Sequence, residues 1–162
     1  MAIKVGDTLP DVKLKELGEG GPKDVSIGEL TKGKRVVFFA VPGAFTPTCS
    51  MKHLPGFVEQ AEAIRKKGVD EIACLSVNDA FVMGAWGRDQ KAKGKVRMMG
   101  DGSGLYTKAL GLELDLIPRG MGVRSQRYSM LVDNGVVKTL NIEGPGKFEV
   151  SGAETMLEQA KK

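Results

Sequence analysis

The chain has 162 residues, of which 41% are hydrophobic, and a formal net charge of +4. This length and apolar content suffice for one sizeable buried core, and no break in composition divides the chain, so we expect a single domain over residues 1–162. The lysines and arginines are mixed with acidic residues and form no dense run among aromatic residues, which argues against a nucleic-acid-binding protein.

The sequence also limits the compartment and the kinds of site. Its first residues, MAIKVGDTLPDVKLKE, contain no apolar signal core, and no apolar stretch is long enough to span a bilayer, so we expect a cytoplasmic protein with no membrane partner. Two cysteines are too few for a disulfide framework, which leaves redox cycling or nucleophilic attack as their chemistry. One histidine and two cysteines without CxxC or HExxH spacing predict no metal site.

The first part of the chain alternates between strand and helix patterns. The segment 34–41, KRVVFFAV, is a continuous apolar run typical of a strand buried on both faces. Residues 57–67 repeat apolar positions at helical spacing and stop at Gly68, which predicts a surface helix. A second buried strand is predicted over 71–77, EIACLSV.

The middle of the chain continues this alternation. Either Asn78 or Asp79 can accept hydrogen bonds from the first free N–H groups of a helix, which we expect to run to about Gln90. The short apolar run over 96–99, VRMM, then predicts a third strand.

The last third predicts a short helix, a hairpin and a final helix. We expect a helix over 103–110, with the glycines of 100–104 (GDGSG) forming a turn, because no Walker lysine or GxGxxG pattern is present. Segments 127–132 and 136–142 flank the sequence Asp-Asn-Gly, which favours an antiparallel hairpin. A helix over 152–160 ends the chain. This order predicts an α/β fold, a central mixed β-sheet flanked by helices on both faces.

The sequence gives Cys49 a reactive setting. It follows the strand over 34–41, at the point where a helix should begin, and ligands of α/β sheets bind beyond the carboxyl ends of strands. Unpaired N–H groups at a helix start favour the thiolate, which is the nucleophile. Pro42 would shield the loop, and Thr46 could cap the helix or present a hydroxyl. We expect a reactive thiol in a partly shielded pocket; a merely buried structural cysteine is the alternative.

Two overlapping motifs carry a family resemblance. Residues 42–49, PGAFTPTC, resemble the peroxiredoxin active-site pattern Pro-x-x-x-Thr-x-x-Cys, and residues 49–57, CSMKHLPGF, resemble its type II, or peroxiredoxin-5-like, branch. The similarity extends through VGD, SVND, GDGSG and RYSMLVDNG and is greatest to plant cytosolic type II enzymes. It implies a thioredoxin-like fold and an antioxidant, thiol-dependent peroxidase that reduces hydrogen peroxide and alkyl hydroperoxides without a cofactor.

The resemblance also assigns roles to four residues. Cys49 is implied to be the peroxidatic cysteine, whose thiolate attacks the peroxide and becomes a sulfenic acid. Thr46 matches the family's hydroxyl, Pro42 its proline and Arg127 its active-site arginine. Arg127 would be carried by the first hairpin strand; the alternative is a solvated surface arginine, and Arg124 is easily mistaken for it. Glutaredoxin with glutathione, or thioredoxin, is the implied reductant.

His53 and Cys74 each allow two interpretations. His53 is four residues after Cys49, but Pro55 should distort this helix and the family gives the corresponding histidine no proton-transfer role, so we expect a structural or capping hydrogen bond. Cys74 is either a core residue or, by resemblance, the cysteine that resolves the sulfenic acid as a disulfide. That bridge needs Cα atoms within about 7 Å, and local unwinding if they lie farther apart. Direct attack by glutathione is the alternative.

The assembly and the functional class also have alternatives. Trp86 and Phe45 are either core residues or, by resemblance, exposed aromatic residues near a homodimer interface. A thioredoxin-like disulfide reductase is disfavoured because no CxxC motif includes Cys49. A redox sensor would be oxidised at Cys49 without sustained recycling by a thiol donor.

Overall fold

The computed structural model describes residues 2–160. Its strands are β1 (Lys13–Gly18), β2 (Gly21–Ser26), β3 (Arg35–Ala40), β4 (Glu71–Ser76), β5 (Arg97–Gly100), β6 (Glu113–Leu116), β7 (Gly122–Ser125), β8 (Tyr128–Asp133) and β9 (Val136–Ile142). Its helical segments are α1 (Ile27–Thr31), η1 (Cys49–His53), α2 (Leu54–Arg65), α3 (Ala80–Asp89), α4 (Leu105–Leu110), η2 (Ile117–Arg119) and α5 (Ala153–Gln159).

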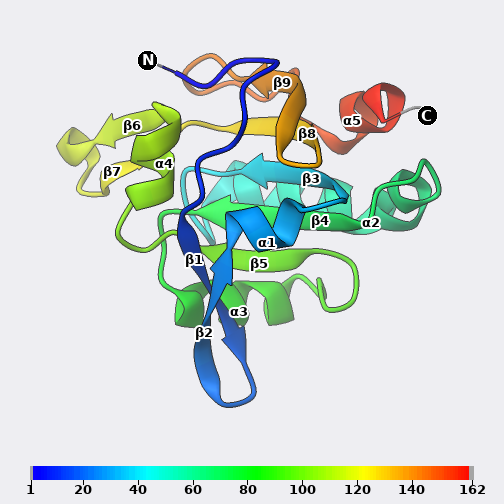
Figure 1. The fold of residues 1–162 in the computed structure, drawn as a ribbon. Coiled ribbons are helices and arrows are strands. Elements are labelled where there is room, and N and C mark those ends of the chain that lie inside the picture. The colour runs from blue at the N-terminus through cyan, green and yellow to red at the C-terminus, as the bar shows by residue number, and fades with distance from the viewer. Residues whose placement is uncertain (1, 161–162) are drawn as a thin grey trace.

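Seven strands form one mixed sheet in the order β2-β1-β5-β4-β3-β8-β9 (Figure 1). The central strands β3, β4 and β5 are parallel, and the outer pairs are antiparallel. Strands β6 and β7 make a separate two-stranded sheet. The predicted mixed α/β sheet is therefore confirmed.

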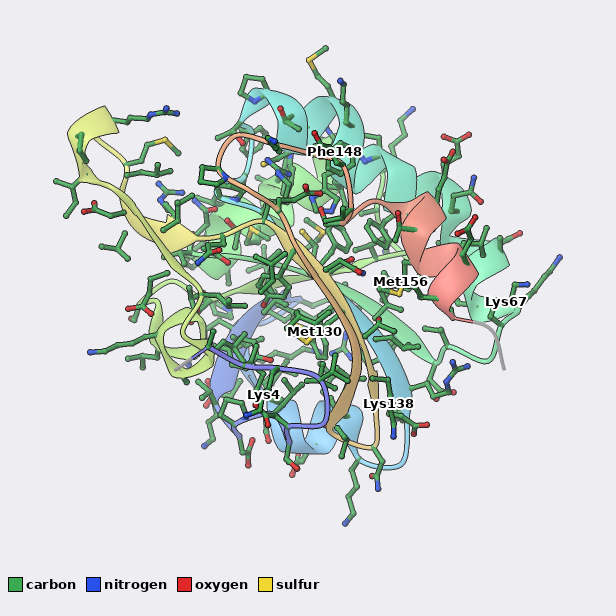
Figure 2. All side chains as sticks on the ribbon, turned by 90° about the horizontal axis from the view of Figure 1, so that it is seen from above. Lys4, Lys67, Met130, Lys138, Phe148 and Met156 are labelled. Atoms are coloured by element: carbon green, nitrogen blue, oxygen red, sulfur yellow. The ribbon has the colours of Figure 1, made fainter. Side chains whose placement is uncertain are left out.

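Helices cover both faces of this sheet, as predicted. Alternate side chains of β3 point to opposite faces, so Val37 and Phe39 join one buried cluster and Val36 and Phe38 the other. Helices α2, α3 and α5 pack on the first face, where Met156 of α5 is fully buried (Figure 2). Helices α1 and α4 pack on the second face. No helix within residues 2–160 is both long and apolar enough to cross a membrane.

The predicted C-terminal hairpin is formed by β8 and β9. Asn134 and Gly135 both have positive φ, 49° and 82°, as a two-residue turn of this kind requires. Leu131 pairs with Thr139, but Val132 pairs with Val137, so β9 contains a bulge between these pairs. At the end of the hairpin away from the turn, Arg127 directly precedes β8 and Glu143 directly follows β9, so these two residues lie side by side.

Two hairpins were not predicted, β1–β2 and β6–β7. The side chains of β2 are exposed or only partly buried along its whole length, so its sequence shows no alternation between apolar and polar residues. β6 likewise has no fully buried residue. The predicted turn at GDGSG is present, and Gly104 adopts φ 71° immediately before α4.

The helix predicted over 57–67 begins earlier. α2 starts at Leu54 and follows directly from η1, a π-helical turn in which the N–H of Leu54 donates to the carbonyl of Cys49. Pro55 has no N–H and its ring would clash with the carbonyl four residues before it, so the regular α-helical ladder is interrupted here. The expected distortion by Pro55 is thus present as a π-turn on its N-terminal side.

Candidate active site

Cys49 lies beyond the carboxyl end of β3, in the first turn of the helical segment that leads into α2. The N–H of Ser50 donates to the carbonyl of Thr46 over 2.9 Å. Thr46 is therefore the N-cap residue of this helical segment. Pro47 occupies the next position, where the missing N–H costs nothing because that group has no partner within the helix. The partial positive charge of the helix start is therefore close to the sulfur.

Two polar side chains contact the sulfur of Cys49. Thr46 Oγ1 is 2.8 Å from Sγ, and Arg127 Nη2 is 3.1 Å from it. The positive guanidinium and the hydroxyl both favour negative charge on the sulfur. Cys49 itself has no exposed surface, so the sulfur is more completely covered than the partly shielded pocket expected from the sequence.

The Thr46 hydroxyl has a choice of acceptors. Its Oγ1 lies 2.7 Å from the carbonyl oxygen of Gly43 as well as 2.8 Å from the sulfur. One hydroxyl hydrogen can serve only one of them well. When Cys49 is a thiol, its S–H can donate to Thr46 while Thr46 donates to Gly43; when it is a thiolate, the hydroxyl hydrogen can turn to the sulfur. Thr46 can therefore exchange its hydrogen-bond acceptor when the charge of Cys49 changes.

Arg127 is fixed from several sides. Arg127 was predicted to be the first residue of the first hairpin strand, but this strand, β8, begins one residue later, so Arg127 directly precedes it. Its side chain is half-buried and not fully solvated. Nη1 lies 2.9 Å from Nδ1 of His53, and the guanidinium carbon lies 5.9 Å from the ring centre of Phe148. With Nη1 bound to His53, Nη2 is directed at Cys49.

His53 makes the structural hydrogen bonds expected of it. Its Nε2 is 2.9 Å from the carbonyl oxygen of Ser151. Because Arg127 can only donate, Nδ1 must be the acceptor and the ring proton must be on Nε2, where it donates to Ser151. Burial, and then the charge of Arg127, lower the pKa of His53 to about 3. The ring is neutral at physiological pH and is not a general base toward Cys49.

The loop between β9 and α5 completes the site and was missed from the sequence. Phe148 lies in this loop (Figure 2). The centre of its ring is 4.9 Å from that of His53. Glu143 begins the loop, and its carboxylate accepts hydrogen bonds from residues 149–151. No spacing motif links these residues to Cys49, since they are about a hundred positions away in the chain.

Pro42 and Arg124 lie on the other side of the site. Arg124 Nη1 donates to the carbonyl oxygen of Pro42 over 3.3 Å, and its Nε donates to Met121. Arg124 therefore holds the loop that precedes Cys49, and of the two arginines only Arg127 reaches the sulfur.

A cavity of about 270 Å³ opens between these two sides. It is lined by the loop from Glu143 to Lys147 and by Pro42, Thr48, Leu114, Gln126 and Arg127. The volume is near the lower end of the range for small-molecule pockets. A small polar molecule could reach Arg127 from here.

Cys74 is fully buried in the central strand β4. It belongs to the same hydrophobic cluster as Cys49, and both thiols are free. Burial, and then proximity to Cys49, raise the pKa of Cys74 well above its usual value. Cys74 is consequently a neutral thiol, and a poor nucleophile, in this conformation.

The two aromatic residues proposed near an interface differ in exposure. Trp86 is fully buried and its Nε1 donates to Ser50 Oγ over 3.0 Å, so of the two alternatives given for Trp86 the core residue is the one observed. Its ring belongs to the same hydrophobic cluster as Cys49. Phe45 is 52% exposed and adopts φ 65°, an unusual conformation for a residue with a side chain.

Residues 2–160 contain no group of three or more His, Cys, Asp or Glu side chains arranged to hold a metal ion. The chemistry available at the site is that of a covered sulfur with a cation and a hydroxyl as its polar neighbours. Such an arrangement suits nucleophilic attack on a small substrate whose departing atom takes up negative charge.

Comparisons with known proteins show which family this chain is similar to. The Redoxin family matches residues 4–157. The chain is 55% identical over 160 residues to Peroxiredoxin-2E, chloroplastic, of Arabidopsis thaliana, covering 96% of this chain and 68% of the relative. It is 53% identical to Peroxiredoxin-2C of Oryza sativa, covering 96% of each. The crystal structure of reduced Prx3 in complex with hydrogen peroxide from Vibrio vulnificus superposes with a TM-score of 0.95 at 54% identity, covering 98% of this chain and 99% of that one.

These matches confirm the resemblance to plant type II peroxiredoxins and the thioredoxin-like fold that it implies. The matched residues include both motifs and the hairpin that carries Arg127. The chain belongs to the Redoxin family and, within it, to the peroxiredoxins, which are thiol-dependent peroxidases.

Proposed function

We propose that Cys49 is the peroxidatic residue of this enzyme and reduces hydrogen peroxide and alkyl hydroperoxides. The observation that carries the proposal is the pair of polar contacts to its sulfur, 2.8 Å from Thr46 Oγ1 and 3.1 Å from Arg127 Nη2, at the start of a helix. Cation, hydroxyl and helix start all favour the thiolate. No other side chain among residues 2–160 combines a nucleophilic atom with two such donors.

In the oxidation step the thiolate of Cys49 attacks one peroxide oxygen. A sulfur–oxygen bond forms, the oxygen–oxygen bond breaks, and the sulfur loses two electrons as it becomes a sulfenic acid. The second oxygen leaves with the electron pair, takes up a proton and departs as water or an alcohol. Arg127 can donate to this leaving oxygen as its charge develops, and the Thr46 hydroxyl can orient the attacked oxygen. Pro42 lines the cavity and brings no N–H of its own to compete for the peroxide.

An external thiol donor, glutaredoxin with glutathione or else thioredoxin, regenerates Cys49. The donor thiolate attacks the sulfenic sulfur, a mixed disulfide forms and water leaves; a second thiol then releases Cys49. Cys74 is a protonated thiol in this conformation and therefore a poor nucleophile toward the sulfenic sulfur. This observation favours the external route over an intramolecular disulfide, and the external thiol needs the turn that covers Cys49 to open locally, because Cys49 has no exposed surface.

A homodimer is the assembly that we propose, with Phe45 on the contact face. Its ring is 52% exposed, and its loop is fixed because the N–H of Ala44 donates to Asn78 Oδ1 over 3.0 Å. Phe81, in the first turn of α3 beyond Asn78, is 62% exposed. Exposed aromatic side chains on rigid backbone are typical of interfaces. A monomeric mass in light scattering at working concentration would contradict the dimer.

The cytoplasm is the location that we propose for this chain. Two free buried thiols suit a reducing compartment, and the cytoplasm is such a compartment. The Arabidopsis relative is named as chloroplastic, so fractionation of cells that make the untagged chain is the appropriate test. Recovery in an organelle fraction would contradict the proposal.

The decisive experiment for the activity is stopped-flow oxidation of the reduced enzyme by limiting hydrogen peroxide, followed by Trp86 fluorescence. Alkylation and mass spectrometry then identify the oxidised cysteine. Fast oxidation confined to Cys49, absent in Cys49→Ser, with repeated turnover when a thiol donor is supplied, supports the peroxidase. Oxidation at the rate of an unactivated thiol would refute it, and oxidation without turnover would point to a sensor.

A further inference from the structure

Glu143 is a buried carboxylate that the reaction proposed above does not use. It directly follows β9 and is only 7% exposed. Its main-chain N–H donates to the carbonyl oxygen of Arg127 over 2.9 Å, and the adjacent pair Tyr128 and Ile142 lies in register in the hairpin. Glu143 is therefore joined through the backbone to the residue that supplies the guanidinium.

The side chain of Glu143 binds the second half of the loop between β9 and α5. Oε2 accepts hydrogen bonds from the N–H groups of Glu149 (2.9 Å), Val150 (2.8 Å) and Ser151 (2.8 Å), and from the Ser151 hydroxyl (2.7 Å). Consecutive backbone N–H groups directed at one anion form a nest. Burial tends to raise the pKa of Glu143, but these hydrogen bonds outweigh it and lower the pKa below its usual value. The group is therefore a carboxylate at neutral pH.

Ser151 connects this nest to the reacting sulfur. Its carbonyl oxygen accepts the Nε2 proton of His53, whose Nδ1 accepts from Nη1 of Arg127, whose Nη2 lies 3.1 Å from Cys49 Sγ. His53 and Arg127 are thus each fixed by a hydrogen bond to the residue before them in this series and by another to the residue after them. A shift of the Ser151 carbonyl would rotate the His53 ring and release the guanidinium.

Phe148 provides a second connection from the same loop. Its ring lies 4.9 Å from that of His53 and 5.9 Å from the guanidinium carbon of Arg127. The loop has no regular secondary structure between β9 and α5, so the hydrogen bonds to Glu143 are what tie its second half to the end of β9.

We propose that Glu143 is a positioning residue for peroxide reduction. By fixing the Ser151 carbonyl it holds His53, and through His53 it holds Arg127 in the orientation in which Nη2 faces Cys49. Glu143 does not touch the sulfur and acts only through Arg127. The inference rests on the proposed function, since it assigns Glu143 to the step in which Cys49 is oxidised.

The test uses Glu143→Gln, which keeps the shape of the side chain and removes its charge. The matched control is Asp101→Asn. Asp101 is another buried carboxylate, 5% exposed, that accepts from the N–H groups of Tyr106 and Thr107 and from the Thr107 hydroxyl. It therefore binds consecutive N–H groups and a hydroxyl in the same way, but these groups belong to α4 and not to the residues that lead to the sulfur.

The measurement is the second-order rate constant for Cys49 oxidation by hydrogen peroxide, with thermal unfolding recorded for each variant. We expect Glu143→Gln to lower this rate constant about 10- to 100-fold, because a displaced catalytic donor costs that much. Asp101→Asn should leave it within about twofold even though both variants lose stability, as sites without shared partners act independently. Equal rate constants in the two variants would overturn the proposal.

A double-mutant cycle separates positioning from general loosening. In an Arg127→Lys chain, which cannot make both guanidinium contacts, Glu143→Gln should slow oxidation by less than about twofold, because the two residues act as one unit. A full, additive loss would show that Glu143 acts independently of Arg127 and would overturn the proposal.

Two further outcomes are distinguishable. If Glu143→Gln does not fold, Ser151→Ala removes only the hydroxyl bond to Glu143 and should slow oxidation about two- to fivefold, the effect of one hydrogen bond; an unchanged rate in that folded variant would overturn the proposal. If the unmodified enzyme itself reacts no faster than a free thiol, the proposed function fails, and the role of Glu143 fails with it.

Discussion

Arg127 donates to Nδ1 of His53, a ring that burial and the charge of this arginine keep neutral. The guanidinium Nη1 lies 2.9 Å from Nδ1 of a ring that has no exposed surface. Burial and this adjacent positive charge together lower the pKa of His53 to about 3, from an ordinary value of 6.5. The histidine thereby acts as a fixed acceptor for the arginine, whatever the pH within the physiological range.

The first prediction concerns the protonation of this ring. Because His53 is the only histidine in the sequence, ¹⁵N labelling of histidine in an untagged chain gives signals from one residue. We expect the neutral Nε2–H tautomer, with no change in its ¹⁵N shifts between pH 7.5 and pH 5. Titration near pH 6.5 would contradict the arrangement with Arg127 and Ser151.

The second prediction follows for stability. Between about pH 3 and pH 6.5 an unfolded chain binds a proton at His53 that the folded chain does not. The contribution of neutral His53 to the free energy of unfolding is therefore fully present above pH 6.5 and decreases as the pH is lowered. Urea denaturation should show a decline approaching about 1.4 kcal/mol per pH unit between pH 6 and pH 5. His53→Gln should flatten this part of the profile. An equal slope in both chains would contradict the prediction.

The third prediction concerns the two donors to Cys49. Arg127→Lys should slow oxidation by hydrogen peroxide about 100-fold, because a charge without a fixed pair of N–H groups cannot serve His53 and the sulfur together. Thr46→Val, which removes the hydroxyl at almost constant shape, should slow it about 10- to 100-fold. Thr46→Ser is the matched control and should retain most of the rate. Stopped-flow fluorescence measures all three, and equal rates in Thr46→Val and Thr46→Ser would contradict the role of the hydroxyl.

The fourth prediction concerns Cys74. Cys74→Ala removes a buried sulfur from the central sheet and should lower the unfolding free energy by about 1 to 2 kcal/mol. Peroxide turnover with glutathione and glutaredoxin should persist, because Cys74 is buried and protonated in the folded chain. Steady-state assays and chemical denaturation check both effects. Loss of turnover in a folded Cys74→Ala enzyme would instead assign the resolving step to Cys74.

The fifth prediction concerns the fluorescence signal itself. Trp86 Nε1 donates to Ser50 Oγ, one residue after Cys49, so a change around the sulfur alters the surroundings of the indole. Ser50→Ala should reduce the amplitude of the fluorescence change on oxidation and leave its rate within about twofold, since Ser50 does not contact the sulfur through its side chain. Mass spectrometry of quenched samples provides the rate independently. A large fall in that rate would give Ser50 a part in the reaction.

Part of the site was predictable because its residues belong to motifs. Cys49 and Thr46 are three positions apart in one short motif, and Arg127 directly precedes a recognisable hairpin. Glu143 and Ser151 were not predictable. Ser151 acts through its main-chain N–H and carbonyl groups, and the Glu143 carboxylate binds main-chain N–H groups. Nearly every residue provides such main-chain groups, so no residue type or spacing marks the two positions.

The same contrast holds for the fold. The continuous apolar runs of β3 and β4 are buried on both faces and were predicted almost to their ends. β2 has no buried face, and its pattern of charged residues therefore gave no strand signal. The start of α2 was displaced because Pro55 allows a π-turn, a hydrogen-bonding change that hydrophobic spacing does not reveal.

The bulge in β9 has a consequence for where this chain tolerates changes in length. From Tyr128 opposite Ile142 to Leu131 opposite Thr139 the strand pairing is regular, and the bulge lies nearer the turn. An added residue at the turn can be taken up on that irregular side. An added residue within the regular pairs would move every following side chain to the opposite face and separate Arg127 from Glu143. Insertions should therefore be accommodated at one end of the hairpin and inactivating at the other.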